Sequence, residues 1–490
     1  MCAGFRTLPA TLLLRPLTPR ERITAVADPG SVQSVDASFD APRPSPHLAR
    51  WGIAAQGDDG IVVARATIDG AKVMIAAQDE RFLGGSAGAN HGDTLRRLFV
   101  RGRAERPAGI VLLAGSAGVR LHEANAAELA LARALAALLD LRAAGVPVLV
   151  VGVADVFGGA SVLACAAQRT ALLPGVRLGL TGPAVIELQR GKSELDAGDA
   201  KAIAAVFGAE ARAAAGHVDL LPGTAEAVHR WIAHGLSESM PFATWVRTMQ
   251  ERLAARLVGS RDAGSSPSLE RSVELATTPV APLPRMLASL YADAEPVDRV
   301  CWLWRMRDRQ VWLSRPFGLG TFGPREAHGL DAALLAHLAA AAPAGARTVF
   351  LVGDSYGHEV SRHAEALCVA QYLAQHAAVL ALLRAQGVRL RGLLTGIGHS
   401  AAFFANALQA PEVYALAGAR VVAMEPAAIA RVTRLPEPEL AALIENDPLL
   451  GQPVRHFARW GGIAEILPDA NRDRLLALAA RDIAPRPPSR

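Results

Sequence analysis

Two short stretches of small residues stand where an apolar run ends and an Ala-rich run begins. The first corner is formed by residues 156–161 (VFGGAS) and the second corner by residues 396–403 (GIGHSAAF). If each stretch joins a buried strand to a helix, the first helical turn has unpaired backbone N–H groups and the positive end of the helix dipole. Such a corner suits an oxyanion, and it needs no charged side chain to bind one.

A third stretch, residues 82–92 (FLGGSAGANHG), is also rich in glycine and precedes the first corner. Glycine-rich stretches can cradle a phosphate-bearing arm. A single Gly-Gly before a helix more often reflects only tight packing between a helix and a sheet. The functional interpretation therefore depends on the two corners recurring at equivalent places.

The sequence repeats itself at a spacing of about 240 residues. Ser116 aligns with Ser355 and Pro183 aligns with Pro426, and the two corners align with each other between these points. We interpret this repeat as an internal duplication. Each copy has the predicted order strand, helix, strand, helix, strand.

The elements of the first copy follow from its residue types. Residues 110–113 and 146–153 are aliphatic runs without polar alternation, as expected for strands covered on both faces. Residues 124–144 are strong helix formers, and Gly145 is a helix stop. Parallel strands joined by helices predict an α/β fold.

The length of 490 residues predicts two to four domains. A segment rich in Ser, Pro and Thr separates the two copies and has the composition of a linker. We therefore expect one domain over 1–258, a linker over 259–290 and a second domain over 291–490.

The composition excludes several classes of protein. The chain is 51% hydrophobic and has 51 Lys and Arg against 46 Asp and Glu, which excludes a disordered chain. The basic residues form no cluster, so no nucleic-acid partner is expected. Four Cys in a chain of this length are too few for a disulfide scaffold, and they are too far apart in sequence for a zinc ribbon. No apolar run reaches the roughly 18 residues of a spanning helix, and we expect a cytoplasmic protein without a membrane partner.

Several motifs resemble a known family. The first half resembles the carboxyltransferase branch of the crotonase (ClpP-like) superfamily, and most closely the beta subunit of biotin-independent malonate decarboxylase. The second half is similar to the gamma subunit of the same complex. The motifs are residues 81–86 (RFLGGS), 91–92 (HG), 118–125 (GVRLHEAN), 157–159 (FGG) and 178–187 (LGLTGPAVIE) in the first half, and 398–404 (GHSAAFF) and 421–425 (VVAME) in the second.

The resemblance implies a fused beta–gamma chain. Its fold would be two crotonase-like (carboxyltransferase) ββα-superhelix domains that arose by internal duplication. The implied reaction is that of a carbon–carbon lyase: a malonyl group on the thiol of an acyl-carrier protein loses CO2 and leaves the acetyl thioester. The thiol would belong to a phosphopantetheine-like group derived from dephospho-CoA, which the carrier protein supplies.

Functional residues are implied in the same way. The catalytic residues would hold the thioester oxygen at the first corner and the carboxylate or CO2 at the second: Gly158, Gly159, Ala160, Ser400, Ala401, Ala402 and His399. The residues near the carrier arm would be Gly84, Gly85, Ser86 and Gly118.

No covalently bound cofactor, biotin or metal is expected. The implied partners are the acyl-carrier protein and the alpha subunit that loads malonate onto it, and self-association is compatible with this scheme.

The chemistry agrees with this assignment. Cleavage of the C–C bond requires stabilisation of the thioester oxygen, and one preorganised donor contributes roughly 3–4 kcal/mol. Protonation of the enolate requires an acid, for which His399, Ser400, His358, His122 and bound water remain open.

Two alternatives remain. Where the gamma pattern usually has Ser-Gly-Ala, this chain has Ala401, so the second corner requires an Ala401 backbone in ordinary φ/ψ space. A biotin-dependent acyl-CoA carboxyltransferase subunit would carry a Gly-Gly-Ala-Tyr turn or a zinc ribbon, and the sequence has neither. A non-catalytic scaffold with one degenerate half is the other alternative.

Overall fold

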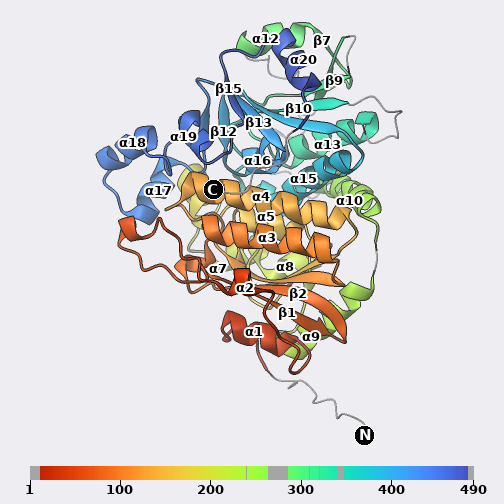
Figure 1. The fold of residues 1–490 in the computed structure, drawn as a ribbon, viewed down its shortest axis with the longest axis vertical. Coiled ribbons are helices and arrows are strands. Elements are labelled where there is room, and N and C mark those ends of the chain that lie inside the picture. The colour runs from red at the N-terminus through yellow and green to blue at the C-terminus, as the bar shows by residue number, and fades with distance from the viewer. Residues whose placement is uncertain are drawn as a thin grey trace. The chain divides into compact units, whose positions relative to one another are not determined.

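The structure, a computed structural model, describes residues 12–238, 240–262, 285–307, 310–318, 320–338 and 347–483. The chain divides into two compact units, the first of residues 1–123 and 133–242 and the second of residues 124–132 and 243–490. Each unit is built on a mixed sheet covered by helices (Figure 1). The predicted α/β class is therefore confirmed.

The first unit follows the chain order of a β-hairpin and then alternating helices and strands. Its elements, with α4 shared between the units, are α1 (Pro19–Val26), α2 (Ala37–Asp40), η1 (Ala49–Trp51), β1 (Ile61–Ile68), β2 (Ala71–Gln78), η2 (Leu83–Gly85), α3 (Ala89–Glu105), β3 (Gly109–Ser116), α4 (Ala124–Ala143), β4 (Val148–Val156), α5 (Gly159–Cys165), β5 (Arg169–Leu172), α6 (Pro183–Arg190), α7 (Ala200–Phe207), α8 (Ala209–Ala214), β6 (Asp219–Leu220) and α9 (Ala225–Ser237).

The sheet of the first unit has the order β1-β2-β3-β4-β5-β6, and only the β1–β2 pair is antiparallel. The α3 helix packs on one face of this sheet, and α1 and α9 pack on the other (Figure 1). Every residue of β3 is buried, as its unbroken apolar run predicts. The helix predicted over 124–144 ends at Ala143, and Gly145 follows with a φ of +88°.

The second unit repeats this order with additional short elements. Its elements are α10 (Phe242–Asp262), α12 (Arg285–Ala292), β7 (Ala294–Pro296), β8 (Leu303–Met306), β9 (Val311–Ser314), α13 (Pro324–Leu338), β10 (Thr348–Gly353), α14 (Arg362–Ala366), α15 (Val369–Ala385), β11 (Arg389–Leu394), β12 (Ile397–His399), α16 (Ser400–Ala405), η3 (Ala407–Gln409), β13 (Glu412–Leu416), β14 (Arg420–Val422), α17 (Pro426–Thr433), α18 (Glu437–Asn446), α19 (Val454–Arg459), β15 (Glu465–Leu467) and α20 (Arg472–Ala480).

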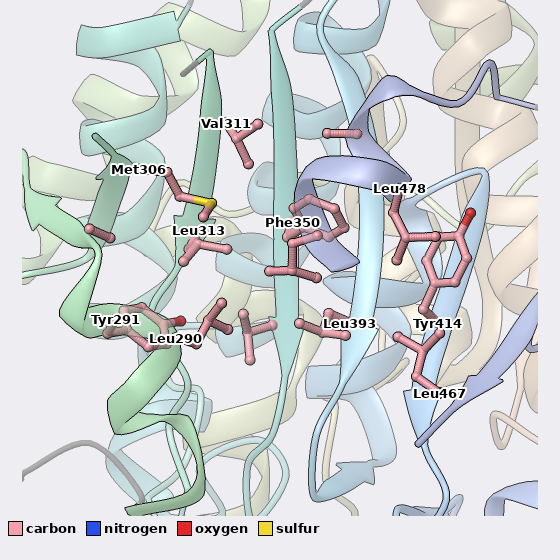
Figure 2. Packing of buried hydrophobic residues seen from close by; sticks show 14 residues of the cluster. Leu290, Tyr291, Met306, Val311, Leu313, Phe350, Leu393, Tyr414, Leu467 and Leu478 are labelled. Atoms are coloured by element: carbon pink, nitrogen blue, oxygen red, sulfur yellow. The ribbon is translucent and has the colours of Figure 1, made fainter. Parts of the chain in front are cut away.

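The main sheet of the second unit has the order β15-β13-β11-β10-β9-β8-β7, and its strands from β9 to β15 are parallel. Leu313 of β9 is the register partner of Phe350 of β10, and Leu393 of β11 is the partner of Val352, two residues further along β10 (Figure 2). Leu290 of α12 and Leu478 of α20 belong to the same buried cluster. Burial of these side chains fixes the central strands, whose carboxyl ends carry the second corner.

The internal duplication is confirmed at the level of single hydrogen bonds. In the first unit, Ser116 Oγ accepts a hydrogen bond from the Gly118 N–H at 3.1 Å. In the second unit, Ser355 Oγ accepts one from the Gly357 N–H at 3.3 Å. The two glycines have φ values of +94° and +91°. Ser116 ends β3 and Ser355 lies two residues after the end of β10, so the aligned serines occupy equivalent positions within their own units.

The structure divides near Phe242, whereas the sequence placed the end of the first domain at residue 258. The reason is that α10 is bound to α15. The Leu253 carbonyl accepts a hydrogen bond from Tyr372 Oη at 3.1 Å, and the Val246 carbonyl accepts one from Gln375 Nε2 at 2.8 Å. Of the expected linker over 259–290, residues 263–284 lie outside the described residues, and residues 285–290 begin α12.

No helix in the described part of the chain combines the length and the apolar character needed to cross a membrane.

Candidate functional site

The first corner depends on two glycines in close contact. Gly158 joins β4 to α5 with φ +60° and ψ −148°, a backbone conformation that is essentially confined to glycine. A Cβ atom on Gly118 would lie 2.9 Å from the Gly158 Cα, and one on Gly158 would lie 3.0 Å from the Gly118 Cα. Two glycine motifs that are separate in the sequence therefore meet at this corner.

The corner leaves two amides for a ligand. Gly159 and Ala160 begin α5, and in the described residues neither N–H has a hydrogen-bond acceptor. Both residues are buried. The Gly158 N–H instead donates to the Leu180 carbonyl at 3.0 Å. The prediction that Gly158 supplies an amide to a ligand does not hold, because this amide is used within the fold; Gly158 shapes the turn.

The residues predicted near a carrier arm pack beside this corner. The Gly84 carbonyl accepts a hydrogen bond from the Ala117 N–H at 3.0 Å, and the Gly85 carbonyl accepts one from Ser116 Oγ at 2.7 Å. A Cβ on Gly85 would lie 2.1 Å from the Gly115 carbonyl oxygen, so close backbone packing by itself requires this glycine. Gly84 is exposed and Ser86 is partly exposed, whereas Gly85 and Gly118 are buried. Their role towards a carrier arm stays a prediction.

A buried cluster of charged side chains contacts the glycine-rich stretch of residues 82–92. The sequence did not predict this cluster. Arg120 contacts Asp59 at 2.5 Å and Glu123 at 2.9 Å, and all three side chains are buried. Arg120 Nη2 also donates to the Ser86 carbonyl at 2.9 Å. Burial raises the pKa of Asp59 to about 6, although Arg120 opposes this shift. Asp59 lies 61 residues before Arg120, so only the fold brings the pair together.

The second corner repeats the turn with a different residue. Ser400 has a φ of +50° at the position equivalent to Gly158. Ala401 is absent from the described residues with positive φ, so its backbone meets the requirement that the sequence raised. Among the described residues, the Ala401 and Ala402 N–H groups have no hydrogen-bond acceptor. This corner therefore also presents two amides.

His399 lies directly before this turn and is 9% exposed. Its Nε2 lies 3.6 Å from Glu425 Oε1. Burial lowers the pKa of His399, although Glu425 and a hydrogen bond with the Tyr356 backbone act in the opposite direction. The imidazole is therefore mainly neutral at pH 7.

The other predicted proton donors also have lowered pKa values. Burial lowers the pKa of His358 to about 3, and His399 contributes to this shift. Burial, assisted by Arg120, lowers the pKa of His122, which belongs to the first unit. None of these imidazoles is mainly protonated at neutral pH.

A small cavity with room for roughly one water-sized molecule lies beside the second corner. Gly398 and Ala402 of the corner line it, together with three phenylalanine rings and the polar residues Asp354, Ser355 and Asn406. Asp354 Oδ1 accepts a hydrogen bond from the Ile397 N–H at 2.9 Å. Asp354 and Asn406 could not be predicted as site residues, because neither belongs to a recognisable motif.

Asn406 is held in place by a buried chain of hydrogen-bonded side chains. His376 Nδ1 lies 2.7 Å from Asp331 Oδ1, and His376 Nε2 lies 3.2 Å from Asn406 Oδ1. Asp331 and His376 are fully buried and Asn406 is 4% exposed. Since the carboxamide oxygen faces His376, its NH2 group is left for another partner, and no acceptor for it occurs in the described residues.

Across the described ranges, no group of three or more His, Cys, Asp or Glu residues is arranged to hold a metal ion. Cys165, Cys301 and Cys368 are free thiols.

Two family descriptions match the chain. The carboxyl transferase domain matches residues 16–226, and the malonate decarboxylase gamma subunit matches residues 319–487. The two matches fall largely in different units of the structure.

Two curated proteins are similar to the first half. The malonyl-S-ACP:biotin-protein carboxyltransferase MADC of Malonomonas rubra is 34% identical over 198 residues, which cover 37% of this chain and 62% of that protein. The acetyl-coenzyme A carboxylase carboxyl transferase subunit beta of Synechococcus sp. (strain JA-2-3B'a(2-13)) is 30% identical over 192 residues, which cover 37% of this chain and 61% of that protein. The chain thus spans about three fifths of the length of these relatives.

Among solved structures, a Pseudomonas malonate decarboxylase hetero-tetramer in complex with malonate is 31% identical, with a TM-score of 0.48. The match covers 52% of this chain and 94% of that chain. Transcarboxylase 12S is 17% identical with a TM-score of 0.40, and the match covers 95% of this chain and 89% of that chain.

Proposed function

We propose that this chain, which matches both a carboxyl transferase domain and a malonate decarboxylase gamma-subunit domain, is a malonate decarboxylase component that decarboxylates a malonyl thioester. The substrate is a malonyl group on an acyl-carrier protein and the product is the acetyl thioester. The carrier protein supplies the phosphopantetheine-like arm, and a separate alpha subunit loads it with malonate. The reaction takes place in the cytoplasm and uses no biotin, metal or covalently bound cofactor.

The first corner stabilises the enolate. When the bond between the α carbon and the carboxylate breaks, its electron pair moves onto the thioester oxygen. The Gly159 and Ala160 N–H groups donate to this oxygen, and each preorganised donor contributes roughly 3–4 kcal/mol. The observation that carries the proposal is that both amides begin a helix and have no acceptor among the described residues.

The second corner orients the departing carboxylate. The Ala401 and Ala402 N–H groups bind its oxygens and hold the breaking bond in a fixed direction. This assignment is supported by the equivalent turns at Gly158 and Ser400, which present amides in the same way. Gly84 and Ser86, the accessible members of the glycine-rich stretch, contact the carrier arm.

A second candidate function is transfer of the carboxyl group to biotin on a carrier protein. The printed name of the M. rubra relative, a malonyl-S-ACP:biotin-protein carboxyltransferase, favours it. The two functions share the first corner and differ in the fate of CO2.

The experiment compares two variants of one residue. Gly159→Pro removes the amide hydrogen at the first position of a helix, where proline is tolerated, and Gly159→Ala keeps it. Both variants add a Cβ, so their difference isolates the donor. The purified chain is combined with malonyl-loaded carrier protein, and CO2 and the acetyl thioester are measured with and without a biotin carrier.

We expect wild type to form the acetyl thioester without biotin, and Gly159→Pro to be about 10²–10³-fold slower than Gly159→Ala. Equal rates for the two variants would remove the first corner from the mechanism. Carboxyl transfer that requires the biotin carrier would replace decarboxylation by the second candidate. No turnover in any arm would leave a scaffold.

A further inference from the structure

The N-terminus of α3 is capped by two buried carboxyl groups of the first unit. Gly88 precedes this helix and has no side chain that could cap it. Glu123 Oε2 accepts a hydrogen bond from the Ala89 N–H at 2.9 Å. Asp59 Oδ2 accepts one from the His91 N–H, also at 2.9 Å. Two of the amides that begin α3 are therefore bound within the fold.

Arg120 connects these two carboxyl groups to the glycine-rich stretch. Its Nη1 lies 2.5 Å from Asp59 Oδ1 and 2.9 Å from Glu123 Oε1. Its Nη2 donates to the Ser86 carbonyl at 2.9 Å, and its guanidinium carbon lies 5.1 Å from the centre of the Phe82 ring. The Arg120 cluster, formed by Asp59, Arg120 and Glu123, thus contacts the stretch from Phe82 to the start of α3.

Backbone hydrogen bonds attach the same stretch to the first corner. The Ala87 N–H donates to the Gly118 carbonyl at 2.7 Å, and the Ala87 carbonyl accepts a hydrogen bond from the Arg120 N–H at 2.9 Å. Gly118 in turn is in close contact with Gly158. The position of the glycine-rich stretch relative to the first corner is therefore set within the first unit.

Gly88 shows how closely the Arg120 cluster packs against the stretch. A Cβ on Gly88 would lie 2.4 Å from Arg120 Nη1 and 2.7 Å from Glu123 Oε1. The φ of Gly88 is −83°, which any residue can adopt. Contact with the cluster, rather than the backbone conformation, therefore requires glycine at this position.

The charges of the Arg120 cluster limit what the stretch can bind. A helix N-terminus commonly binds phosphate, but here two carboxyl groups face the first turn of α3. Arg120 supplies one positive charge against these two groups, so the cluster has no excess positive charge to offer an anion. The exposed backbone of Gly84 suits an uncharged chain that carries amide groups.

Resting on the proposed function, we propose that Arg120 is a positioning residue for the carrier arm. With Asp59 and Glu123 it holds the glycine-rich stretch in the shape that binds the uncharged, amide-bearing segment of the arm. The phosphate of the arm binds outside this stretch. Since Arg120 acts on binding and not on the breaking bond, disturbing the cluster raises KM and leaves kcat nearly unchanged.

The test compares two glycines that each precede a helix. Gly88→Ala places a methyl group against Arg120 and Glu123. Gly182→Ala is the matched control, because Gly182 precedes α6 with a φ of −64° and has no described atom within 4 Å of an added Cβ. We measure kcat and KM for CO2 release from malonyl-loaded carrier protein. Pantetheine, which is the uncharged segment alone, and inorganic phosphate are tested as competitive inhibitors at constant ionic strength.

We expect Gly88→Ala to raise both KM and the inhibition constant of pantetheine at least about tenfold, with kcat within about threefold of wild type. Gly182→Ala should change none of these values. Any inhibition by inorganic phosphate should be equal in wild type and Gly88→Ala.

An unchanged KM in Gly88→Ala, a loss confined to kcat, or weaker inhibition by phosphate in place of pantetheine would overturn the inference and leave the proposed function standing. A wild type that pantetheine does not inhibit would overturn it as well. A wild type that releases no CO2 from the loaded carrier refutes the proposed function, and with it this role of Arg120.

Should Gly88→Ala fail to fold, Arg120→Lys is compared with wild type. Lysine keeps the positive charge but lacks the planar fork that reaches Asp59, Glu123 and the Ser86 carbonyl together. We expect the same rise in KM and in the inhibition constant of pantetheine. Wild-type values for both in this variant would overturn the inference.

Discussion

Gly158 and Ser400 occupy equivalent turns, and their φ values of +60° and +50° differ little although only one of them is glycine. A left-handed backbone costs a residue with a Cβ roughly 1–2 kcal/mol. The sequence raised the question of whether Ala401 has a strained, positive φ. In the structure the residue with a positive φ is Ser400, one position earlier. Strain at Ser400 is therefore built into the turn that presents the Ala401 and Ala402 amides.

Ser400→Gly should relieve this strain. We expect its free energy of unfolding to exceed that of Ser400→Ala by about 0.5–1 kcal/mol, since alanine keeps the Cβ and glycine loses more entropy on folding. Urea unfolding of both variants measures the difference. A Ser400→Gly variant no more stable than Ser400→Ala would show that the turn carries no strain.

Gly118→Ala should disrupt the first corner. Its Cβ would meet the Gly158 Cα at 2.9 Å, in addition to the cost of a φ of +94°. Gly30→Ala is the control, because Gly30 has a φ of +76° and nothing within 4 Å of the added atom. We expect losses of about 1 kcal/mol for Gly30→Ala and at least about 2 kcal/mol for Gly118→Ala. Denaturant unfolding decides this, and equal losses would argue against the close contact.

The Asp331–His376 pair should act as one unit. His376→Leu leaves the buried Asp331 carboxyl without its partner, and we expect a loss of roughly 3–5 kcal/mol. The double variant Asp331→Leu/His376→Leu should recover part of that loss. A double-mutant cycle in urea measures the coupling, and additive effects would contradict the hydrogen-bonded chain that holds Asn406.

Glu128 should make stability fall with rising pH. Burial raises its pKa from 4.5 to about 8. The folded chain keeps this proton between these values while the unfolded chain releases it, so the Glu128 contribution is lost as the pH rises from about 4.5 to 8. The slope is at most about 1.4 kcal/mol for each pH unit.

Glu128→Gln removes this titration. Its melting temperature should differ little from wild type at pH 5 and exceed it at pH 8. The same difference at both pH values would show that Glu128 titrates normally.

Much of the architecture could be predicted because it is local. The strands β3 and β4 each contain an aliphatic run, α4 ends beside Gly145, and the sequence repeat alone aligns Ser116 with Ser355. The corners were found for the same reason, since small residues between an apolar run and an Ala-rich run are visible in one window of sequence.

The remaining features arise from contacts between distant residues. Asp354 meets Ile397 across 43 positions, and His376 meets Asp331 across 45. The engaged amide of Gly158 depends on Leu180, which no motif connects to it. The pattern of apolar residues along the sequence predicts which residues of a helix or strand are buried. It does not predict which polar groups contact one another at the ends of the strands.

Ser116 and Ser355 each accept a hydrogen bond from a glycine two residues later, and this bond holds the loop in both halves. The residue before each serine is therefore free to differ between the two halves. Selection can replace the residue at 115 or 354 while the serine–glycine bond keeps the loop intact. An ancestral gene doubled in this way could acquire new chemistry in one copy by a few nucleotide changes, with the other copy still preserving the inherited scaffold.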